Sequence, residues 1–180
     1  PMMLLDTKNP AKPKLLAVAQ PMQEFIHSNA WPNAGKDRWA LTSGETWTPG
    51  PGTSRCNDKS AGLATWDTSK VKSRKTFMMV DVWRPTNGTV TDGNPVVNAP
   101  FGCSSHWFQE HPDFRNGGLV AAGFYNHGTR FLNIAKNGKI EQAGWFLPHG
   151  GGTSAAYWID DEVVYAIDYQ RGFDVLRYNG

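Results

Sequence analysis

The stretch from Gly118 to Pro148 constrains the fold more than any other part of the sequence. It contains three short apolar runs, at residues 118–125, 128–134 and 140–148, which are separated by turn residues. Asn137-Gly138 lies between the second and third runs, and this dipeptide between apolar runs is the strongest short signal of a β-hairpin. The stretch therefore predicts three consecutive antiparallel strands.

The rest of the chain repeats this unit. Asn133, near the end of the second run, corresponds to Asp6, Asp67 and Arg177 in similar runs elsewhere. A proline follows Asp6, Asp67 and Asn133 after 15, 18 and 15 residues, in each case behind a turn and a further apolar run. Asn133 and Arg177 are 44 residues apart, which matches the roughly 40–45 residues of a four-stranded propeller blade. The longer spacings between the other anchors contain loop-like insertions at residues 48–60 and 86–102.

This repeat predicts an all-β fold with about three blades of a β-propeller, each a four-stranded antiparallel sheet. Naming the strands a to d from the innermost, we expect a partial blade at 1–21, blades at 22–85 and 103–148, and a partial blade at 153–180. Strand a is expected at 24–27, 105–108 and 155–158. Because a propeller needs at least about four blades, we expect a fragment of a larger propeller that another chain or segment completes. A complete small β-sandwich is the alternative.

One family resemblance follows from the anchors. Leu4-Leu-Asp-Thr-Lys-Asn-Pro10 matches a pattern of two apolar residues, Asp-Thr and a proline three residues later. This pattern resembles the LVIVD-repeat β-propellers of bacterial secreted proteins, and residues 103–178 are similar to the C-terminal part of large actinobacterial members. The Asp-Thr pair is absent at Asn133-Ile134 and Arg177-Tyr178, so these two repeats are assigned from strand spacing alone. The resemblance implies an extracellular or cell-surface protein, although the chain contains no signal peptide.

Composition excludes some classes of partner. The formal net charge is +2 at pH 7, and basic and acidic residues are mixed along the chain. Basic residues do not alternate with aromatic ones as they do in single-strand nucleic-acid binders, so we expect no nucleic-acid partner. No apolar run approaches the roughly 20 residues of a membrane helix, so we expect no membrane span.

Histidines are the candidates for metal binding. His106 begins an innermost strand, His27 holds the corresponding place in the preceding blade, and His149 lies in the loop before the next innermost strand. Imidazoles from successive blades could bind a transition metal at the mouth of a central channel. The alternative is that these are structural histidines held by hydrogen bonds, with no cofactor. A Ser–His–Asp hydrolase site is less favoured, because the sequence contains no Gly-x-Ser-x-Gly motif.

The long insertions indicate a binding face. In a propeller both would leave the same side of the blades, where loops on a rigid scaffold commonly carry function. The residues that we expect to contribute to this face are Trp47, Ser105, His127 and Tyr157. Cys56 and Cys103 lie in or beside the two insertions, so we expect a disulfide between them and an oxidising compartment. Two free thiols are the alternative.

Three functions remain. We expect a secreted or cell-surface binding or scaffold module without catalysis, with a protein or glycan ligand. The alternative is a metal-dependent enzyme whose histidine site lies at the channel mouth. A second alternative is carbohydrate binding through the tryptophan-rich loops, although burial between blades also explains such residues. Fold alone does not decide among these functions.

Overall fold

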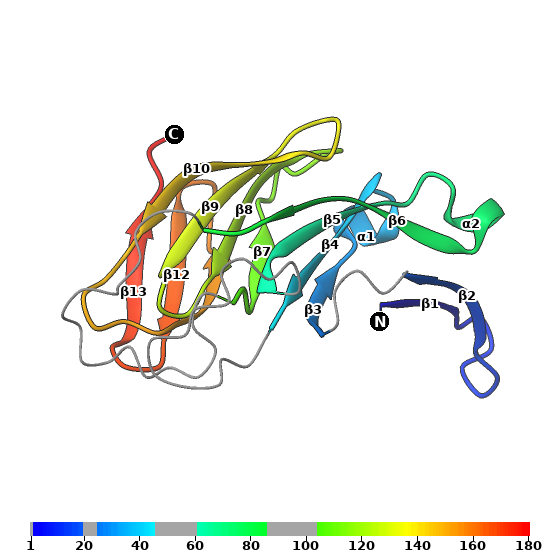
Figure 1. The fold of residues 1–180 in the computed structure, drawn as a ribbon, viewed down its shortest axis with the longest axis horizontal. Coiled ribbons are helices and arrows are strands. Elements are labelled where there is room, and N and C mark those ends of the chain that lie inside the picture. Colours follow the sequence, from blue (N-terminus) through cyan, green and yellow to red (C-terminus); the bar gives the residue numbers. More distant parts are fainter. Residues whose placement is uncertain (1, 20–24, 46–60, 86–103) are drawn as a thin grey trace.

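A computed structural model describes residues 2–19, 25–45, 61–85 and 104–180, and Figure 1 shows its arrangement. Strands are the main regular structure of these residues, and the two helical segments are single turns of four residues each. The all-β prediction is therefore confirmed. The elements are β1 (Met3–Asp6), β2 (Lys14–Ala19), β3 (Ile26–Ala30), α1 (Pro32–Gly35), β4 (Trp39–Gly44), β5 (Leu63–Asp67), α2 (Val71–Arg74), β6 (Thr76–Trp83), β7 (Phe108–Glu110), β8 (Gly118–Gly123), β9 (Thr129–Ile134), β10 (Ile140–Phe146), β11 (Thr153–Trp158), β12 (Val163–Asp168) and β13 (Gly172–Arg177).

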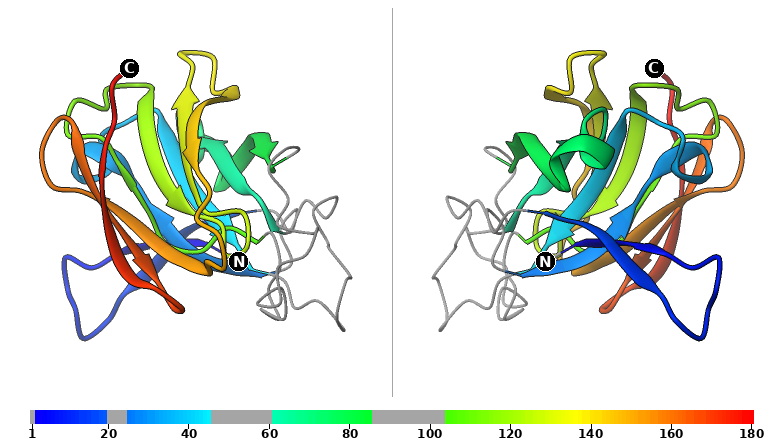
Figure 2. Two further views of the ribbon diagram at one scale, coloured as in Figure 1. Left: turned by 90° about the vertical axis from the view of Figure 1, so that its left-hand side faces the viewer. Right: turned by 90° about the vertical axis from the view of Figure 1, so that its right-hand side faces the viewer.

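The strands form three sheets in chain order. Strands β3 to β6 pair consecutively and antiparallel in the first sheet, β7 to β10 do the same in the second, and β11 to β13 form the third. Figure 1 shows the sheets side by side along the longest axis, with β13 near one end and β1–β2 near the other. Views along that axis show the strong twist of the sheets (Figure 2).

The hairpin β1–β2 differs from its expected place in a separate blade. Strand β2 pairs in parallel with β6 through Val18–Thr76 and Ala19–Phe77, so the hairpin extends the first sheet to six strands. The hydroxyl of Thr76 also donates a hydrogen bond of 2.8 Å to the carbonyl of Val18. An outer strand exposes unpaired backbone groups, and β2 covers part of this edge of β6.

The expected innermost strand at 105–108 begins later, because β7 spans Phe108–Glu110. The backbone amides of the preceding residues instead bind all three sheets. Ser105 donates to Ala61 at 2.7 Å, His106 to Gly123 at 2.9 Å, and Trp107 to Ser154 at 3.1 Å. Residues 104–107 therefore connect the sheets at one point, and His106 lies at that point.

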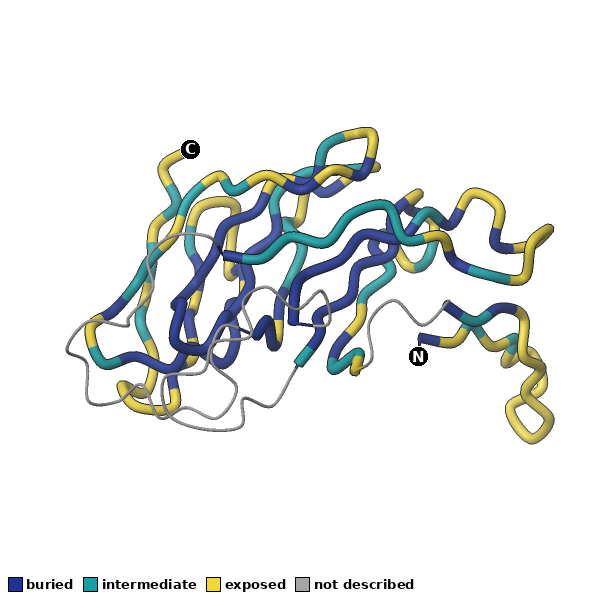
Figure 3. Tube along the Cα trace, viewed as in Figure 1, coloured by how far each residue is buried: buried dark blue, intermediate teal, exposed yellow. Residues whose placement is uncertain are grey.

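Apolar side chains fill the spaces between sheets. Trp39, Leu41 and Leu63 of the first sheet pack against Val120 and Leu132 of the second in the largest of three clusters. A second cluster lies between the first sheet and the β1–β2 hairpin, and a third joins the second and third sheets. The central strands β4, β5, β8 and β9 are consequently buried almost throughout, as the dark blue segments of Figure 3 show.

The predicted Asn137-Gly138 hairpin joins β9 to β10, so this prediction is confirmed. Gly138 has φ +83°, in the left-handed region that favours glycine. The turn packs on the first sheet, since its Gly138 carbonyl accepts a 2.6 Å hydrogen bond from the Thr65 hydroxyl. The Ile140 amide donates to the Asp81 carboxylate at 3.0 Å.

We expect Gly138→Ala to lower the free energy of unfolding by about 2–4 kcal/mol, from left-handed strain and overpacking combined. A Cβ at this position would lie 2.9 Å from the Trp39 ring and 3.0 Å from Val80. Gly172→Ala is the matched control, because Gly172 has φ +90° with no atom within 4 Å of an added Cβ. Denaturant unfolding of both variants should show the larger loss for Gly138→Ala, and equal losses would contradict the packed turn.

Candidate metal centre

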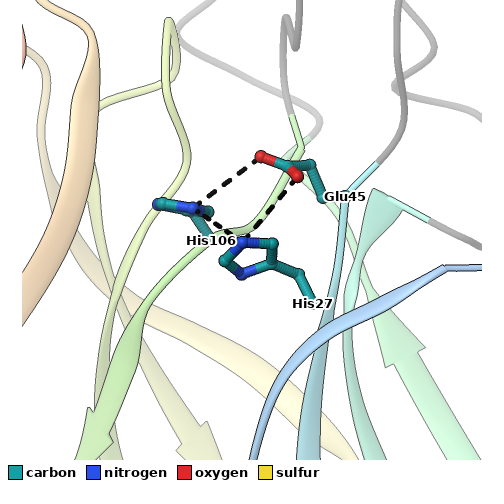
Figure 4. Close-up of side chains that lie close together, drawn as sticks. All are labelled: His27, Glu45 and His106. Carbon is teal, nitrogen blue, oxygen red and sulfur yellow. Dashed lines mark hydrogen bonds and ion pairs between the residues drawn. The ribbon is translucent and has the colours of Figure 1, made fainter.

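His27, Glu45 and His106 converge at the junction of the sheets (Figure 4). The Nε2 atoms of the two histidines are 3.2 Å apart. The Glu45 carboxylate lies against both, with Oε2 at 3.8 Å from His27 Nε2 and Oε1 at 3.7 Å from His106 Nε2. This is the one group of three or more potential metal-ligating side chains found among the described residues.

A β-bulge directs His27 toward this point. Strand β3 pairs with β4 through Ile26–Gly44 and then Ser28–Ser43, so His27 is the extra residue without a partner across the ladder. Bulges bend a strand and redirect side chains, and they occur often beside functional sites. Glu45 directly follows β4, and its amide donates a 3.2 Å hydrogen bond to the Phe25 carbonyl. The antiparallel pair β3–β4 therefore brings His27 and Glu45 to the same end of the first sheet.

Hydrogen bonds hold His106 in one orientation. Its Nδ1 lies 2.8 Å from the Ser154 carbonyl oxygen and 3.1 Å from the Ser154 hydroxyl. Because a carbonyl oxygen only accepts, Nδ1 carries the proton and Nε2 keeps its lone pair, which is directed at His27. The Ser28 hydroxyl donates to the His106 carbonyl at 2.9 Å and fixes the backbone as well. A histidine ligand whose other nitrogen donates to a carbonyl is the usual arrangement in metal sites.

Burial sets the charge states around the cluster. His106 is 6% exposed, and this desolvation lowers its pKa below the usual 6.5, so the imidazole is neutral at pH 7. The buried Tyr125 hydroxyl donates to Glu45 Oε1. Burial, and then this hydrogen bond, raise the pKa of Tyr125, so its phenol stays protonated. The neutral His106 imidazole therefore faces a carboxylate that a phenol orients.

The spacing of the ligand atoms suits a transition metal. Zinc binds imidazole nitrogen at about 2.0–2.1 Å, so two ligands of a tetrahedral site are about 3.3–3.4 Å apart. The two Nε2 atoms are at 3.2 Å, and each is within 3.8 Å of a carboxylate oxygen. The two carboxylate contacts use different oxygens of Glu45, and the three ligand atoms that the side chains offer lie within 4.8 Å of one another. Two histidines with one glutamate are an established ligand set for catalytic zinc.

Aromatic rings surround the two imidazoles. Trp107 packs edge-on against His27 with ring centroids 5.4 Å apart, and Tyr125 lies 5.0 Å from His106. The Phe25 ring centroid lies 6.3 Å from that of His27. Trp107 and Phe25 are nevertheless 44% and 54% exposed, so their outer surfaces remain in contact with water. The cluster is thus shielded by rings that are themselves partly exposed.

The structure brings together two of the three histidines predicted to bind a metal. His27 and His106 meet, whereas His149 is an exposed residue of the turn after β10 and is not part of the group. Of the predicted binding face, Ser105 and His127 are buried, and Tyr157 is 36% exposed on β11. Ser105 instead supports the site, because its hydroxyl lies between the amide and carbonyl of Gly44. Trp47, Cys56 and Cys103 lie outside the described residues, and so does any disulfide between the two cysteines.

Sequence reasoning did not identify Glu45 and Tyr125. In the structure the end of β4 lies beside the start of β3, where His27 lies, because the two strands pair antiparallel. His27 was instead expected at the end of its strand (24–27), so the expected pairing did not indicate Glu45. Tyr125 reaches Glu45 from the turn after β8, where it has φ +37° and pairs with Thr153 across an isolated bridge. That approach depends on the packing of different sheets, so no local pattern indicates it.

We expect the free energy of unfolding of the metal-free protein to fall as the pH is lowered below 6.5. The folded-state pKa of His106 lies below the unfolded value of 6.5, so the unfolded chain takes up this proton first. The contribution of His106 is complete above pH 6.5 and is lost as the pH falls through the folded pKa. Urea unfolding of wild type and His106→Gln across this range should show a smaller pH dependence in the variant. If the free energy of unfolding changed equally with pH in both proteins, His106 would not be a buried neutral imidazole.

Within the part of the chain that the structure describes, no helix has the length and apolar character needed to cross a membrane. No protein-family model and no curated protein matches the chain, so the resemblance to LVIVD-repeat propellers stays a prediction.

Proposed function

We propose that this protein binds a divalent transition metal, zinc in the first instance, through Nε2 of His27, Nε2 of His106 and the Glu45 carboxylate. The observation that carries the proposal is the convergence of the three side chains from two different sheet regions, with a 3.2 Å separation between the imidazole nitrogens. The orientation of His106 by the Ser154 carbonyl supports it, since that bond leaves Nε2 available as a ligand.

The choice of metal follows from the donor atoms. Imidazole suits zinc, copper, iron and nickel, whereas sites for magnesium and calcium are built from oxygen ligands. Zinc sites with three protein ligands keep a further position for water or substrate, and these are the catalytic sites. Metal-assisted hydrolysis is therefore the reaction class that this ligand set supports, which favours the metal-dependent enzyme over a module without catalysis.

In the metal-free protein the two histidines of the cluster are joined by a hydrogen bond whose direction can be assigned. Because Nδ1 of His106 carries a proton, Nε2 of His106 accepts in the 3.2 Å contact and Nε2 of His27 donates. The buried Nδ1 of His27 then has no hydrogen-bond partner in the described part of the chain. If Nε2 of His27 held a metal, the proton of that ring would reside on Nδ1. The cluster thus needs no large rearrangement to accept an ion.

We also propose that the three sheets are successive blades of a β-propeller. The support is the consecutive antiparallel order of strands in each sheet and the side-by-side packing of the sheets. The first strand of one blade and the segment leading into the next would then place His27 and His106 at the mouth of the central channel. Loops and strand ends on such a rigid scaffold are common sites of function.

Calorimetric titration of metal-free protein with zinc tests the proposed function. We expect one equivalent to bind, and the His149→Ala control to bind equally well, because His149 lies outside the cluster. Zinc binding that is absent, or that is lost in His149→Ala, would overturn the proposal. Unaltered secondary structure in a protein that binds no metal would instead favour the non-catalytic binding module.

A further inference from the structure

The third sheet carries an apolar face that no described residue covers. One face of the sheet packs on the second sheet through Ala156, Trp158 and Val164. The opposite face presents five large apolar side chains that are 36–61% exposed, at Tyr157, Tyr165, Ile167, Phe173 and Val175. We call these five residues the C-terminal face.

Their register makes this face continuous. Tyr165 of β12 pairs with Tyr157 of β11 on one side and with Val175 of β13 on the other, while Ile167 pairs with Phe173. Directly paired residues on one side of a sheet are neighbours about 4.5–5.5 Å apart. Contiguous exposed apolar area of this kind marks an interaction surface in a soluble protein.

The other end of the molecule has a matching surface. In the β1–β2 hairpin, Leu4 and Ala17 face the first sheet, whereas Met3, Leu5 and Leu15 are 45–58% exposed. We call Met3, Leu5 and Leu15 the N-terminal face. Figure 1 shows the third sheet and the β1–β2 hairpin, which carry these faces, toward opposite ends of the longest axis. Between them, buried apolar clusters join the first sheet to the second and the second sheet to the third. A further cluster lies between the hairpin and the other strands of the first sheet.

The charges at the two ends are complementary. Residues 2–19 carry three lysines, at positions 8, 12 and 14, against Asp6, for a balance of +2. Residues 153–180 carry five acidic residues, at positions 160, 161, 162, 168 and 174, against Arg171 and Arg177, for a balance of −3. Like faces would therefore repel each other, whereas unlike faces attract.

We propose that the chain associates head to tail with a second copy of itself, with the C-terminal face of one copy packed on the N-terminal face of the other. This contact continues the sheet-on-sheet packing seen twice within the chain. It buries the exposed apolar side chains at both ends. It is a heterologous contact, so it forms a ring where the rotation between copies closes and a longer assembly where it does not. The inference goes beyond metal binding and is independent of it.

Light scattering after size exclusion, over a range of protein concentrations, tests the contact. We expect wild type to associate, and Val175→Glu or Leu15→Glu to raise the dissociation constant by about tenfold or more, because each buries a charge in an apolar contact. Lys136→Glu, an exposed change on the β9–β10 turn, should leave it unchanged. Higher salt should weaken association of the wild type.

Mixing the two blocked variants distinguishes this contact from others. Val175→Glu retains the N-terminal face and Leu15→Glu retains the C-terminal face, so an equimolar mixture should form a 1:1 pair that grows no further. Monomeric wild type at the highest concentration would overturn the proposal, as expected if another segment of a longer protein covers the faces. Association that only one of the two variants impairs would overturn it too, since a contact between like faces depends on one face alone.

Discussion

Replacing Trp39 with alanine should lower the free energy of unfolding by about 3–5 kcal/mol, the largest stability effect that we expect from a single substitution. Trp39 is 1% exposed and lies in the apolar cluster between the first and second sheets. Its indole nitrogen donates to the Asn116 carbonyl at 3.3 Å, and Gly138 of the β9–β10 turn packs against its ring. Truncation therefore leaves a cavity at the interface that holds two sheets together.

Trp145→Ala provides the control for this measurement. Trp145 lies on β10 and is 55% exposed, so its loss should change the free energy of unfolding by less than about 1 kcal/mol. Chemical denaturation followed by circular dichroism would give both values. A similar loss for the two tryptophans would mean that the first and second sheets do not pack as described.

Loss of a ligand should have the largest effect on metal binding. Removing a residue that only hydrogen-bonds to a metal ligand weakens metal binding by about 10–100-fold. We expect His106→Gln and Glu45→Gln, which change the ligands themselves, each to weaken zinc binding by more than this. Each change replaces an imidazole or a carboxylate with a neutral amide, and zinc sites are built from His nitrogen, Cys sulfur and Asp or Glu oxygen. Competition titration against a chelator of known affinity measures such changes.

Tyr125→Phe should have a zinc affinity between those of wild type and the ligand variants. A purely structural role of Tyr125 would not produce this order. The Tyr125 hydroxyl donates to Glu45 and is not itself a ligand, so its removal should weaken zinc binding by about 10–100-fold without abolishing it. The order of affinities should be wild type, then Tyr125→Phe, then the two ligand variants. Equal affinities for all four proteins would show that zinc binds elsewhere.

The sequence predicted the strand series because its signals are local. Asn137-Gly138 marks the β9–β10 hairpin, and the apolar runs place β8 to β11 within one or two residues of their observed bounds. His27 and His106 were expected near each other because they occupy similar places in successive blades, and the structure brings their side chains together. These inferences need only the turn chemistry and the period of two residues in a strand.

Other features depend on long-range packing and were beyond prediction. The bulge at His27 is a register shift between β3 and β4, and the sequence of either strand alone does not specify it. The parallel contact of β2 with β6, and the three-way attachment of residues 104–107, arise from the meeting of separate sheets. The secreted location and the glycan ligand stay predictions.

The most direct test of the metal centre is anomalous X-ray diffraction at the zinc edge from crystals of the protein loaded with one equivalent of zinc. The account predicts a single peak between His27, His106 and Glu45, at about 2.0–2.1 Å from both Nε2 atoms. A peak at any other residues, or an empty cluster in a protein that retains its zinc, would contradict the account.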